Sequence, residues 1–242
     1  MTRNLTGKIV IITGAGSGVG RASACALAAE GAVPVLVGRR PAPLKETLEL
    51  IEAAGGTARV IPADVTDESA VSQLMTETVA SLGGCDAVVC AAGVGLYGLV
   101  ESYPLDQWRE TMDTNLTQFF LLSRAAIPVL RNRGGGAIIA IGSGAGKQGY
   151  ANLAAYAASK HAVVGFAQSL AEEVRPDNIR VSVINPGSIL TDFAGRSAAE
   201  KSAIASEHGK RYLQPDDVAE AVLWLMQQPA NAWTQEMNLW PW

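Results

Sequence analysis

The sequence predicts an α/β fold in which one parallel sheet has helices on both faces, as a single domain over residues 1–242. Short β-branched apolar runs alternate with helical stretches from end to end, which is the pattern of parallel strands connected by helices. No linker, charge run, internal repeat or low-complexity tract interrupts this alternation. A chain of 242 residues also suits one sheet that shares a core with its helices.

The first predicted strand is the apolar run Ile9–Ile12, which leads directly into the glycine-rich stretch Thr13–Gly20. Small and aliphatic residues from Ala22 to Ala29 then predict a helix that ends at Gly31. A strand, a glycine turn and a helix N-terminus together form an anion site, because backbone N–H groups point outward and glycine lets a pyrophosphate approach. The glycines that set its Gly-x-x-x-Gly-x-Gly spacing are Gly14, Gly18 and Gly20.

The second predicted strand, Val33 to Val37, ends at Gly38-Arg39-Arg40. At this point of a nucleotide-binding unit, an acidic residue accepts the 2′-hydroxyl of the adenosine ribose, whereas an arginine accommodates a 2′-phosphate. Gly38 stands where the acid would be, and the fork of a guanidinium group matches the oxygens of a phosphate. This strand end therefore predicts NADP (NADPH) rather than NAD, with Arg39 and Arg40 as its ligands.

The third and fourth predicted strands are Ala58 to Ile61 and Ala87 to Cys90. Asp64 follows the third strand, where its carboxylate either hydrogen-bonds an adenine amino group or caps the helix that begins around Asp67. The sequence leaves both interpretations open. The fourth strand runs into Ala91-Ala92-Gly93, small residues that let a flat ring lie against the backbone.

The later elements are a long helix around Gln107 to Arg131, a strand from Ala137 to Ile141, a helix that begins near Tyr156 and a last strand from Gln235 to Leu239. Tyr156 and Lys160 are one helical turn apart, so their side chains share a face. A tyrosine has a pKa near ~10 in peptides, and an ammonium about 4 Å away favours the phenolate by about 4 kcal/mol at an effective dielectric of roughly 20. The pair therefore predicts a tyrosine whose pKa is lowered toward the range of general acid–base catalysis.

Together these motifs are similar to those of the short-chain dehydrogenase/reductase family over essentially the whole chain. The matching residues are Thr13–Gly20, Asp64-Val65, Ala92-Gly93, Asn115, Ser143, Tyr156, Lys160, Pro186-Gly187 and Thr191. The resemblance implies a doubly wound, Rossmann-type parallel sheet of about seven strands. It also implies an oxidoreductase that interconverts a ketone and a secondary alcohol by hydride transfer.

The resemblance assigns four catalytic residues. Tyr156 would be the general acid/base, Lys160 would hold the nicotinamide ribose and lower the tyrosine pKa, and Ser143 would orient the substrate carbonyl. Asn115 would hold a water in the proton relay behind Lys160. The implied cofactor-binding residues are Gly14, Ser17, Gly18, Val19, Gly20, Arg39, Arg40, Asp64, Val65, Cys90, Tyr156, Lys160, Ile189 and Thr191.

One departure from the family pattern follows the fourth strand. The family usually has Asn-Asn-Ala-Gly there, and this chain has Cys90-Ala91-Ala92-Gly93. Backbone contacts to the cofactor survive the change, but the side-chain hydrogen bonds that brace the strand do not. We therefore expect a locally less rigid strand end.

The substrate pocket is expected beyond the carboxyl ends of the strands. Residues 188–212 predict a short substrate loop, with Gly195 to Ala199 as a mobile lid helix that favours a small or medium carbonyl compound. The candidate substrate contacts are Leu96, Tyr97, Gln148, Tyr150, Ser188 and Phe193.

Composition excludes several other classes. The net charge of −4, with basic residues interspersed among acids, provides no footprint for nucleic acid. The polar start of the chain lacks the apolar segment of a signal peptide, no run is long enough to span a bilayer, and we expect a cytoplasmic protein. Two histidines and three scattered cysteines make a metal site improbable and favour reduced thiols; these are His161, His208, Cys25, Cys85 and Cys90.

Three functions remain open from the sequence: an NADPH-dependent ketone reductase, a 3-oxoacyl carrier-protein reductase, and a catalytically silent cofactor sensor or scaffold. The carrier-protein reductase should show a basic docking surface, for which Arg131, Arg133 and Arg175 are candidates. We also expect a homo-oligomer, a tetramer before a dimer. Its predicted contacts are the helix near Tyr156, through the small residues Ala157, Ala158, Gly165 and Ala167, and the terminal Trp233, Trp240 and Trp242.

Overall fold

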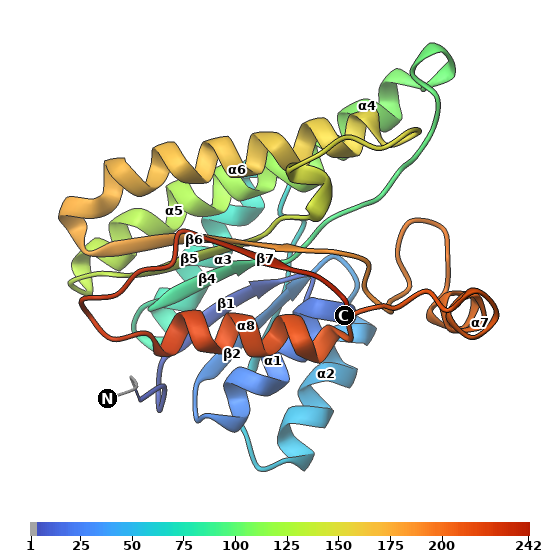
Figure 1. Ribbon diagram of the computed structural model, residues 1–242. Coiled ribbons are helices and arrows are strands. Elements are labelled where there is room, and N and C mark those ends of the chain that lie inside the picture. The colour runs from blue at the N-terminus through green and yellow to red at the C-terminus, as the bar shows by residue number, and fades with distance from the viewer. Residues whose placement is uncertain (1–3) are drawn as a thin grey trace.

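The computed structural model describes residues 4–242, which form a seven-stranded sheet between two layers of helices (Figure 1). All neighbouring strands pair in parallel, in the order β3-β2-β1-β4-β5-β6-β7, which confirms the predicted α/β fold. The strands are β1 (Ile9–Thr13), β2 (Val33–Gly38), β3 (Arg59–Pro62), β4 (Ala87–Cys90), β5 (Gly136–Ile141), β6 (Ile179–Pro186) and β7 (Glu236–Leu239).

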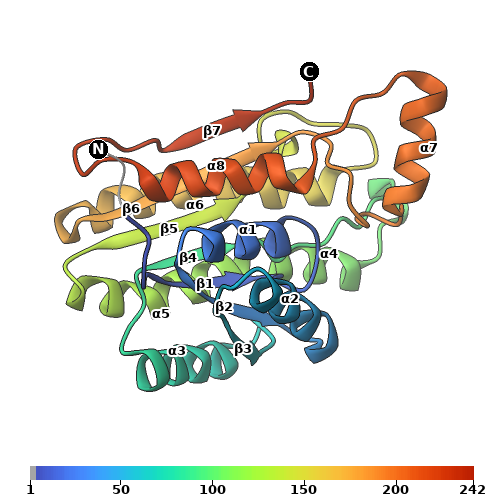
Figure 2. The ribbon, with the colours of Figure 1, turned by 90° about the horizontal axis from the view of Figure 1, so that it is seen from below.

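The helices divide between the two faces of the sheet (Figures 1 and 2). They are α1 (Gly18–Ala29), α2 (Pro41–Ala53), α3 (Glu68–Leu82), α4 (Leu105–Met112), α5 (Gln118–Asn132), α6 (Ala154–Val174), α7 (Ala198–His208) and α8 (Pro215–Gln227). One apolar cluster joins the sheet to α3, α5 and α6, and a second joins it to α1, α2 and α8. The central strands are covered on both sides, which explains their continuous apolar runs.

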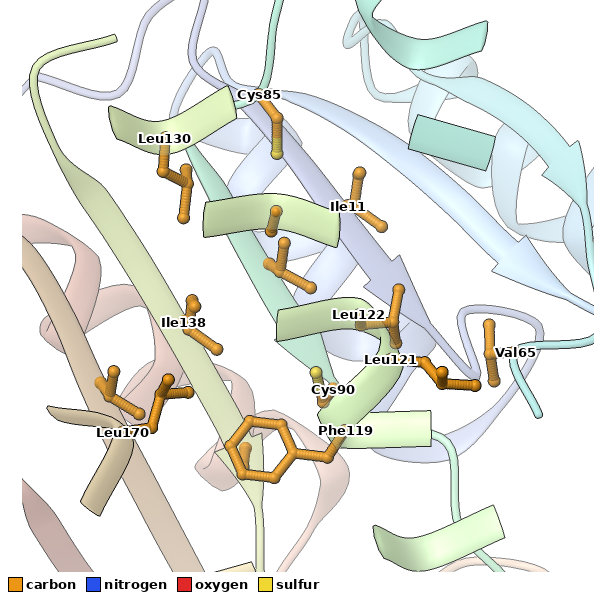
Figure 3. Close-up of a cluster of buried hydrophobic side chains, with 14 of the residues drawn as sticks. Ile11, Val65, Cys85, Cys90, Phe119, Leu121, Leu122, Leu130, Ile138 and Leu170 are labelled. Atoms are coloured by element: carbon orange, nitrogen blue, oxygen red, sulfur yellow. The ribbon is translucent and has the colours of Figure 1, made fainter. Parts of the chain in front are cut away.

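Figure 3 shows the cluster under α5. Ile11 and Ile138 rise from β1 and β5 against Phe119, Leu122 and Leu130 of α5, and all five side chains are buried. Each such side chain contributes about 1.5–3 kcal/mol when it leaves water. This packing fixes the position of α5 and α6 over the sheet.

The chain order reverses beside β1, whose neighbours are β2 on one side and β4 on the other. Connections leave such a switch point in opposite directions, so a crevice opens at the carboxyl ends of the two strands. Thr13 at the end of β1 spans this point, because its Oγ1 accepts hydrogen bonds from the backbone N–H groups of Ala91 and Ala92 at 3.1 and 3.0 Å. The fold therefore places a crevice where the glycine-rich turn begins.

The predicted long helix consists of α4, a π-helical turn over Asp113–Thr117, and α5. Such turns occur frequently at functional sites, and this one contains Asn115. On α6, two of the residues that we expected on the outer face are buried within the monomer: Ala157 faces the side of Tyr156, and Ala167 lies in the core under the helix. That part of the interface prediction is wrong, whereas Ala158 and Gly165 are exposed.

Helix α7 lies apart from the sheet and buries none of its residues (Figures 1 and 2). It begins after Ser197, whose side chain and that of Glu200 form a capping box. The predicted lid helix at Gly195 to Ala199 therefore starts too early, because Gly195 and Arg196 belong to a tight turn. Among residues 4–242, no helix is both long and apolar enough to cross a membrane.

Candidate active site

A cleft of about 1100 Å³ lies along the carboxyl ends of the central strands and adjoins a smaller cavity of about 200 Å³. Gly14, Ser17 and Gly93 line both spaces, so the two form one continuous groove over the switch point. The smaller cavity lies over the ends of β2 and β3. The larger one lies over β5 and β6 and under the segment that leads to α7.

The glycine-rich turn has the geometry of an anion site. Gly14 and Gly18 have φ angles of 66° and 50°, which side chains rarely adopt, and a Cβ on Gly20 would lie 2.3 Å from the carbonyl oxygen of Gly14. Helix α1 begins at Gly18, and the hydroxyl of Ser17 makes no capping bond to it. The first N–H groups of the helix are therefore available to an anion.

The end of β2 fits a phosphate better than a ribose hydroxyl. Arg39 and Arg40 are exposed and line the small cavity, and in the described part of the chain neither guanidinium pairs with a carboxylate. Asp64 lines the same cavity, and its Oδ1 accepts hydrogen bonds from the N–H and hydroxyl of Thr66 at 3.0 and 2.7 Å. The helix cap is Asp67, which accepts from Ala70 N–H, so capping is not the role of Asp64.

Ser143, Tyr156 and Lys160 converge on the larger cleft. Ser143 follows β5, where its N–H donates to Asn185 Oδ1 and its Oγ accepts from the N–H of Ala145. Tyr156 and Lys160 lie on one face of α6, and both are buried. Lys160 Nζ donates to the carbonyl oxygen of Ile141 at 2.8 Å and lies 5.8 Å from the centre of the Tyr156 ring.

The electrostatics differ from the sequence-based expectation for the tyrosine. Burial raises the pKa of Tyr156 well above its usual value, and a hydrogen bond with Ser143 only partly opposes this. Burial also lowers the pKa of Lys160 to about 8. The expected lowering of the tyrosine pKa by Lys160 is wrong for the protein alone, because desolvation of the phenolate outweighs an ammonium directed at Ile141.

Asn115 holds the loop that follows β4. Its Nδ2 donates to the carbonyl oxygen of Val94 and to Ser159 Oγ, both at 3.0 Å, and its Oδ1 accepts from Val94 N–H at 2.8 Å. Both N–H groups of the Asn115 amide therefore already have protein acceptors, so neither is free to donate to the relay water that the family resemblance implies. A Cβ on Gly93 would lie 3.2 Å from this amide and 3.8 Å from Lys160 Nζ, so Asn115 fixes the backbone beside the lysine.

The departure after β4 does not leave the strand end unbraced. Thr13 and Asn115 hold Ala91, Ala92 and Val94 by hydrogen bonds, which corrects the expectation of lower rigidity. The side chain of Cys90 packs in the apolar core beneath α5 (Figure 3) and lines neither cavity. Any cofactor contact at this position is therefore limited to the backbone.

The structure places four of the candidate substrate residues in the larger cleft: Tyr97, Tyr150, Ser188 and Phe193. Leu96 and Gln148 do not line it; Leu96 offers its carbonyl oxygen to Tyr103, and the Gln148 amide donates to the Tyr150 hydroxyl. The remaining predicted cofactor residues are placed in the groove: Val65 in the small cavity, and Val19, Ile189 and Thr191 in the large one.

Sequence reasoning missed several side chains of the cleft, above all Trp240, which we assigned to a subunit interface. Its indole covers Gly144 and Gly187, where added Cβ atoms would lie 2.5 and 2.9 Å from the ring. Two glycines that directly follow Ser143 and Pro186 were the available signal, because a large ring needs such space. Leu153, Arg21 and Pro215 also line the cleft and were not predicted, whereas Arg196, Lys201, Lys210 and Tyr212 belong to the predicted substrate loop without having been singled out.

Trp233 and Trp242, the other two terminal tryptophans, have different environments. The indole nitrogen of Trp233 donates to the carbonyl oxygen of Val181, so the ring packs within the monomer. Trp242 is 99% exposed. Within residues 4–242, no group of His, Cys, Asp and Glu side chains gathers in a way that could hold a metal ion.

Comparison with known proteins finds that residues 8–202 match the sequence profile of the short chain dehydrogenase family. The 2,3-dihydro-2,3-dihydroxybenzoate dehydrogenase of Bacillus subtilis is 34% identical over 241 residues, which cover 95% of this chain and 92% of that enzyme. Glycine betaine reductase ATRR of Emericella nidulans is 33% identical over 98% of this chain, and the match spans only 19% of that longer protein.

Solved structures are similar over nearly the whole chain. A metagenomic short-chain oxidoreductase in complex with NADP has a TM-score of 0.86 and 32% identity, with 99% of both chains covered. The alcohol dehydrogenase of the archaeon Thermococcus sibiricus, complexed with 5-hydroxy-NADP, has a TM-score of 0.87 and 27% identity, with 96% of this chain and 95% of that one covered.

Proposed function

This chain belongs to the short-chain dehydrogenase family, and we propose that it is an NADP(H)-dependent oxidoreductase that interconverts a ketone and a secondary alcohol. The observation that carries the proposal is one groove with a glycine cradle and unpaired arginines at one end and Ser143, Tyr156 and Lys160 at the other. A nucleotide cofactor that lies along this groove brings its reactive end to the three polar side chains.

In the direction of reduction, NADPH bound in the groove would supply the hydride that the carbonyl carbon accepts. Tyr156 donates its phenolic proton to the carbonyl oxygen, so one hydride and one proton convert the ketone to the alcohol. Ser143 donates a hydrogen bond to the same oxygen and holds it near the phenol. Lys160 provides the positive charge that stabilises the phenolate left behind.

The direction of the Tyr156 pKa shift favours this assignment of the acid. Because burial raises its pKa, the phenol keeps its proton at neutral pH and is ready to donate it. In the reverse direction, the phenolate must form before it accepts the alcohol proton, which requires Lys160 to be charged. The raised pKa therefore supports Tyr156 as the proton donor when a ketone is reduced.

The cofactor proposal is NADPH, held by Arg39 and Arg40 at the 2′-phosphate and by the Gly14–Gly20 turn at the pyrophosphate. Two similar structures were solved with NADP or 5-hydroxy-NADP, which supports the same choice here. Val65, Ile189 and Thr191 are the further proposed contacts along the groove, and Asp64 is the candidate for the adenine.

The alternative of a 3-oxoacyl carrier-protein reductase depended on a basic docking surface beside the active site. Arg131 pairs with Asp177, Arg133 with Asp86, and Arg175 with Glu172. All three arginines precede the amino ends of β5 and β6, at the opposite end of the sheet from the cleft. They therefore form no basic surface beside the active site.

We also propose a homo-oligomer, most simply a tetramer that pairs α5 and α6 of neighbouring copies. Exposed apolar side chains on α4 and α5 support it, notably Leu105, Trp108 and Phe120. Light scattering should give a mass that is a multiple of 25.2 kDa. A monomer at micromolar concentration would contradict this part of the proposal.

The enzymatic proposal is tested with a panel of ketones and secondary alcohols, with nicotinamide absorbance as the readout. We expect NADPH oxidation with at least one ketone and the reverse signal with its alcohol and NADP. If no carbonyl or alcohol changes the absorbance while NADPH still binds, the chain is a cofactor sensor or scaffold and the proposal fails.

A further inference from the structure

Aromatic side chains concentrate around the proposed proton donor. Four of the five tyrosines of the chain, together with Phe193 and Trp240, line the larger cleft. Tyr156 itself belongs to a small apolar cluster with Ala145 and Ala157, against which Leu153 and Phe193 pack. A short aliphatic ketone has too little surface to contact this many aromatic rings.

Two rings stand at an angle to Tyr156. The ring centres of Tyr97 and Tyr156 are 5.7 Å apart with planes at 71°, and those of Phe193 and Tyr156 are 6.1 Å apart with planes at 63°. Both pairs have the edge-to-face geometry that aromatic rings prefer. Tyr97 and Phe193 therefore form two aromatic walls beside the ring of Tyr156.

Phe193 is held in place by a tight turn. Its backbone N–H and carbonyl bond those of Arg196 at 3.1 and 3.4 Å, and both intervening residues, Ala194 and Gly195, have positive φ angles of 60° and 73°. A Cβ on Gly95 would lie 2.7 Å from the Phe193 ring, so the turn already packs on the loop after β4. This wall is formed before any ligand binds.

A third ring, that of Trp240, lines the same cleft. Trp240 covers Gly144, the neighbour of Ser143 in the chain, and lines the same cleft as Ser143. Three lysines line the cleft: Lys160 donates to the carbonyl oxygen of Ile141, Lys201 donates to that of Thr191 at 2.7 Å, and Lys210 Nζ lies 5.0 Å from the centre of the Tyr212 ring. Apart from Lys160, the side chains that pack directly against the Tyr156 ring are apolar or aromatic, and none of them carries a charge.

We propose that the substrate is an uncharged aryl ketone, or its secondary alcohol, whose flat ring packs against Tyr97, Phe193 and Trp240. This proposal rests on the proposed function and specifies its substrate class. Each ring contact adds a modest preference, and together they should give an aryl ketone a kcat/KM about tenfold or more above that of an alkyl ketone of equal carbon number.

The test compares 1-phenylethanone, 2-octanone and 2-oxo-2-phenylacetate with NADPH, in the wild-type protein and in matched variants. Phe193→Leu and Trp240→Leu should each lower kcat/KM for 1-phenylethanone by a factor about 2–10 times larger than the change for 2-octanone. Phe193→Tyr keeps the ring and should keep the preference. Trp242→Leu is the matched control, because the same residue type in the same tail lies outside the cleft.

Each outcome decides the substrate class. Equal or faster reduction of 2-octanone, or an equal loss for both ketones in Phe193→Leu, overturns it and leaves the proposed function standing. Preference for the charged 2-oxo-2-phenylacetate overturns the uncharged class and points to Arg196 at the outer end of the turn. No turnover of any carbonyl or alcohol, in folded protein that binds NADPH, overturns both proposals.

Discussion

The two ends of the groove are built in different ways. The end over β2 and β3 is lined by glycines and short turns, chiefly from segments 14–17, 38–44, 63–66 and 92–94. The end over β5 and β6 consists of side chains from loops far apart in the chain, such as Tyr97, Ser143, Phe193 and Trp240. The first end presents a cradle to an anion, and the second presents a buried acid between rings.

This difference explains how substrate preference and cofactor preference can vary separately. A phosphate cradle made of N–H groups depends on glycine positions, which admit little variation. Side chains on separate loops can change one at a time without disturbing the sheet. We therefore expect substitutions at one end to leave the chemistry of the other end intact.

The largest expected effect is at the catalytic end. Tyr156→Phe keeps the ring between Tyr97 and Phe193 but removes the proton, so kcat should fall by about 10²-fold to 10⁴-fold or more. NADPH affinity, measured by fluorescence titration, should stay within about twofold because the distant cradle is untouched. A variant that keeps a substantial fraction of wild-type turnover would show that another group moves the proton.

The cofactor end should respond to a change of two residues. Each hydrogen bond to a charged group is worth about 1.5–3 kcal/mol, so wild-type protein should prefer NADPH over NADH by about tenfold to a few hundredfold. Gly38→Asp with Arg39→Ala should reverse this preference, because the acid accepts the ribose hydroxyl and repels the phosphate. The Gly38 site has room, since an added Cβ would approach only the Leu44 side chain, at 3.5 Å.

Fluorescence titrations with both reduced cofactors measure that change. The kcat with saturating NADH in the double variant should approach the wild-type value with NADPH, which is the control that the catalytic end is intact. Equal or better NADH affinity in the wild-type protein would contradict the role of the arginines.

A smaller expected effect is on folding stability, through the ionisation of the buried Lys160 side chain. Lys160 is buried, and its pKa of about 8 is below the value of an unfolded lysine, near ~10.4. Between these pH values the unfolded chain binds more protons, so the contribution of Lys160 to stability rises with pH through that window. At lower pH the buried charge destabilises the fold.

Lys160→Met removes that charge. In the protein without ligand at pH 7, the free energy of unfolding should rise by about 1–3 kcal/mol. The substitution removes the cost of burying the charge, and this gain is larger than the loss of the hydrogen bond to Ile141. The rise of the free energy of unfolding with pH between about 8 and 10 should be weaker than in the wild type, while turnover and NADPH affinity both fall. Urea denaturation at several pH values checks this, and a variant less stable than the wild type at pH 7 would contradict it.

Six of the seven strands could be predicted because each signal lies within one element, whereas β6, α2 and α8 were not predicted. The glycine turn after β1, the Arg39-Arg40 pair after β2 and the one-turn spacing of Tyr156 and Lys160 all depend on neighbours in the sequence. The boundaries found in the structure differ by only a residue or two from the predicted strands, as at β3 and β7. Local periodicity carries that information.

The rest depends on contacts between distant segments. Trp240 reaches the cleft because β7 pairs in parallel with β6 and places Leu239 beside Pro186, a register that the sequence does not reveal. The pKa of Tyr156 depends on its burial, which the packing of Tyr97 and Phe193 helps to create. Likewise, the burial of Ala157 and Ala167 follows from how α6 rotates on the sheet, because helical small residues alone do not choose a face.

We propose that one groove brings the hydride of NADPH and the proton of Tyr156 to the same carbonyl group. The most direct measurement incubates the protein with a ketone that it consumes and NADPH deuterated at the transferable position, then locates the label in the alcohol by mass spectrometry. We expect one deuterium on the carbon that bears the new hydroxyl, and no labelled product from Tyr156→Phe over the same time. Alcohol that carries no deuterium on that carbon when either face of the nicotinamide is labelled would contradict it.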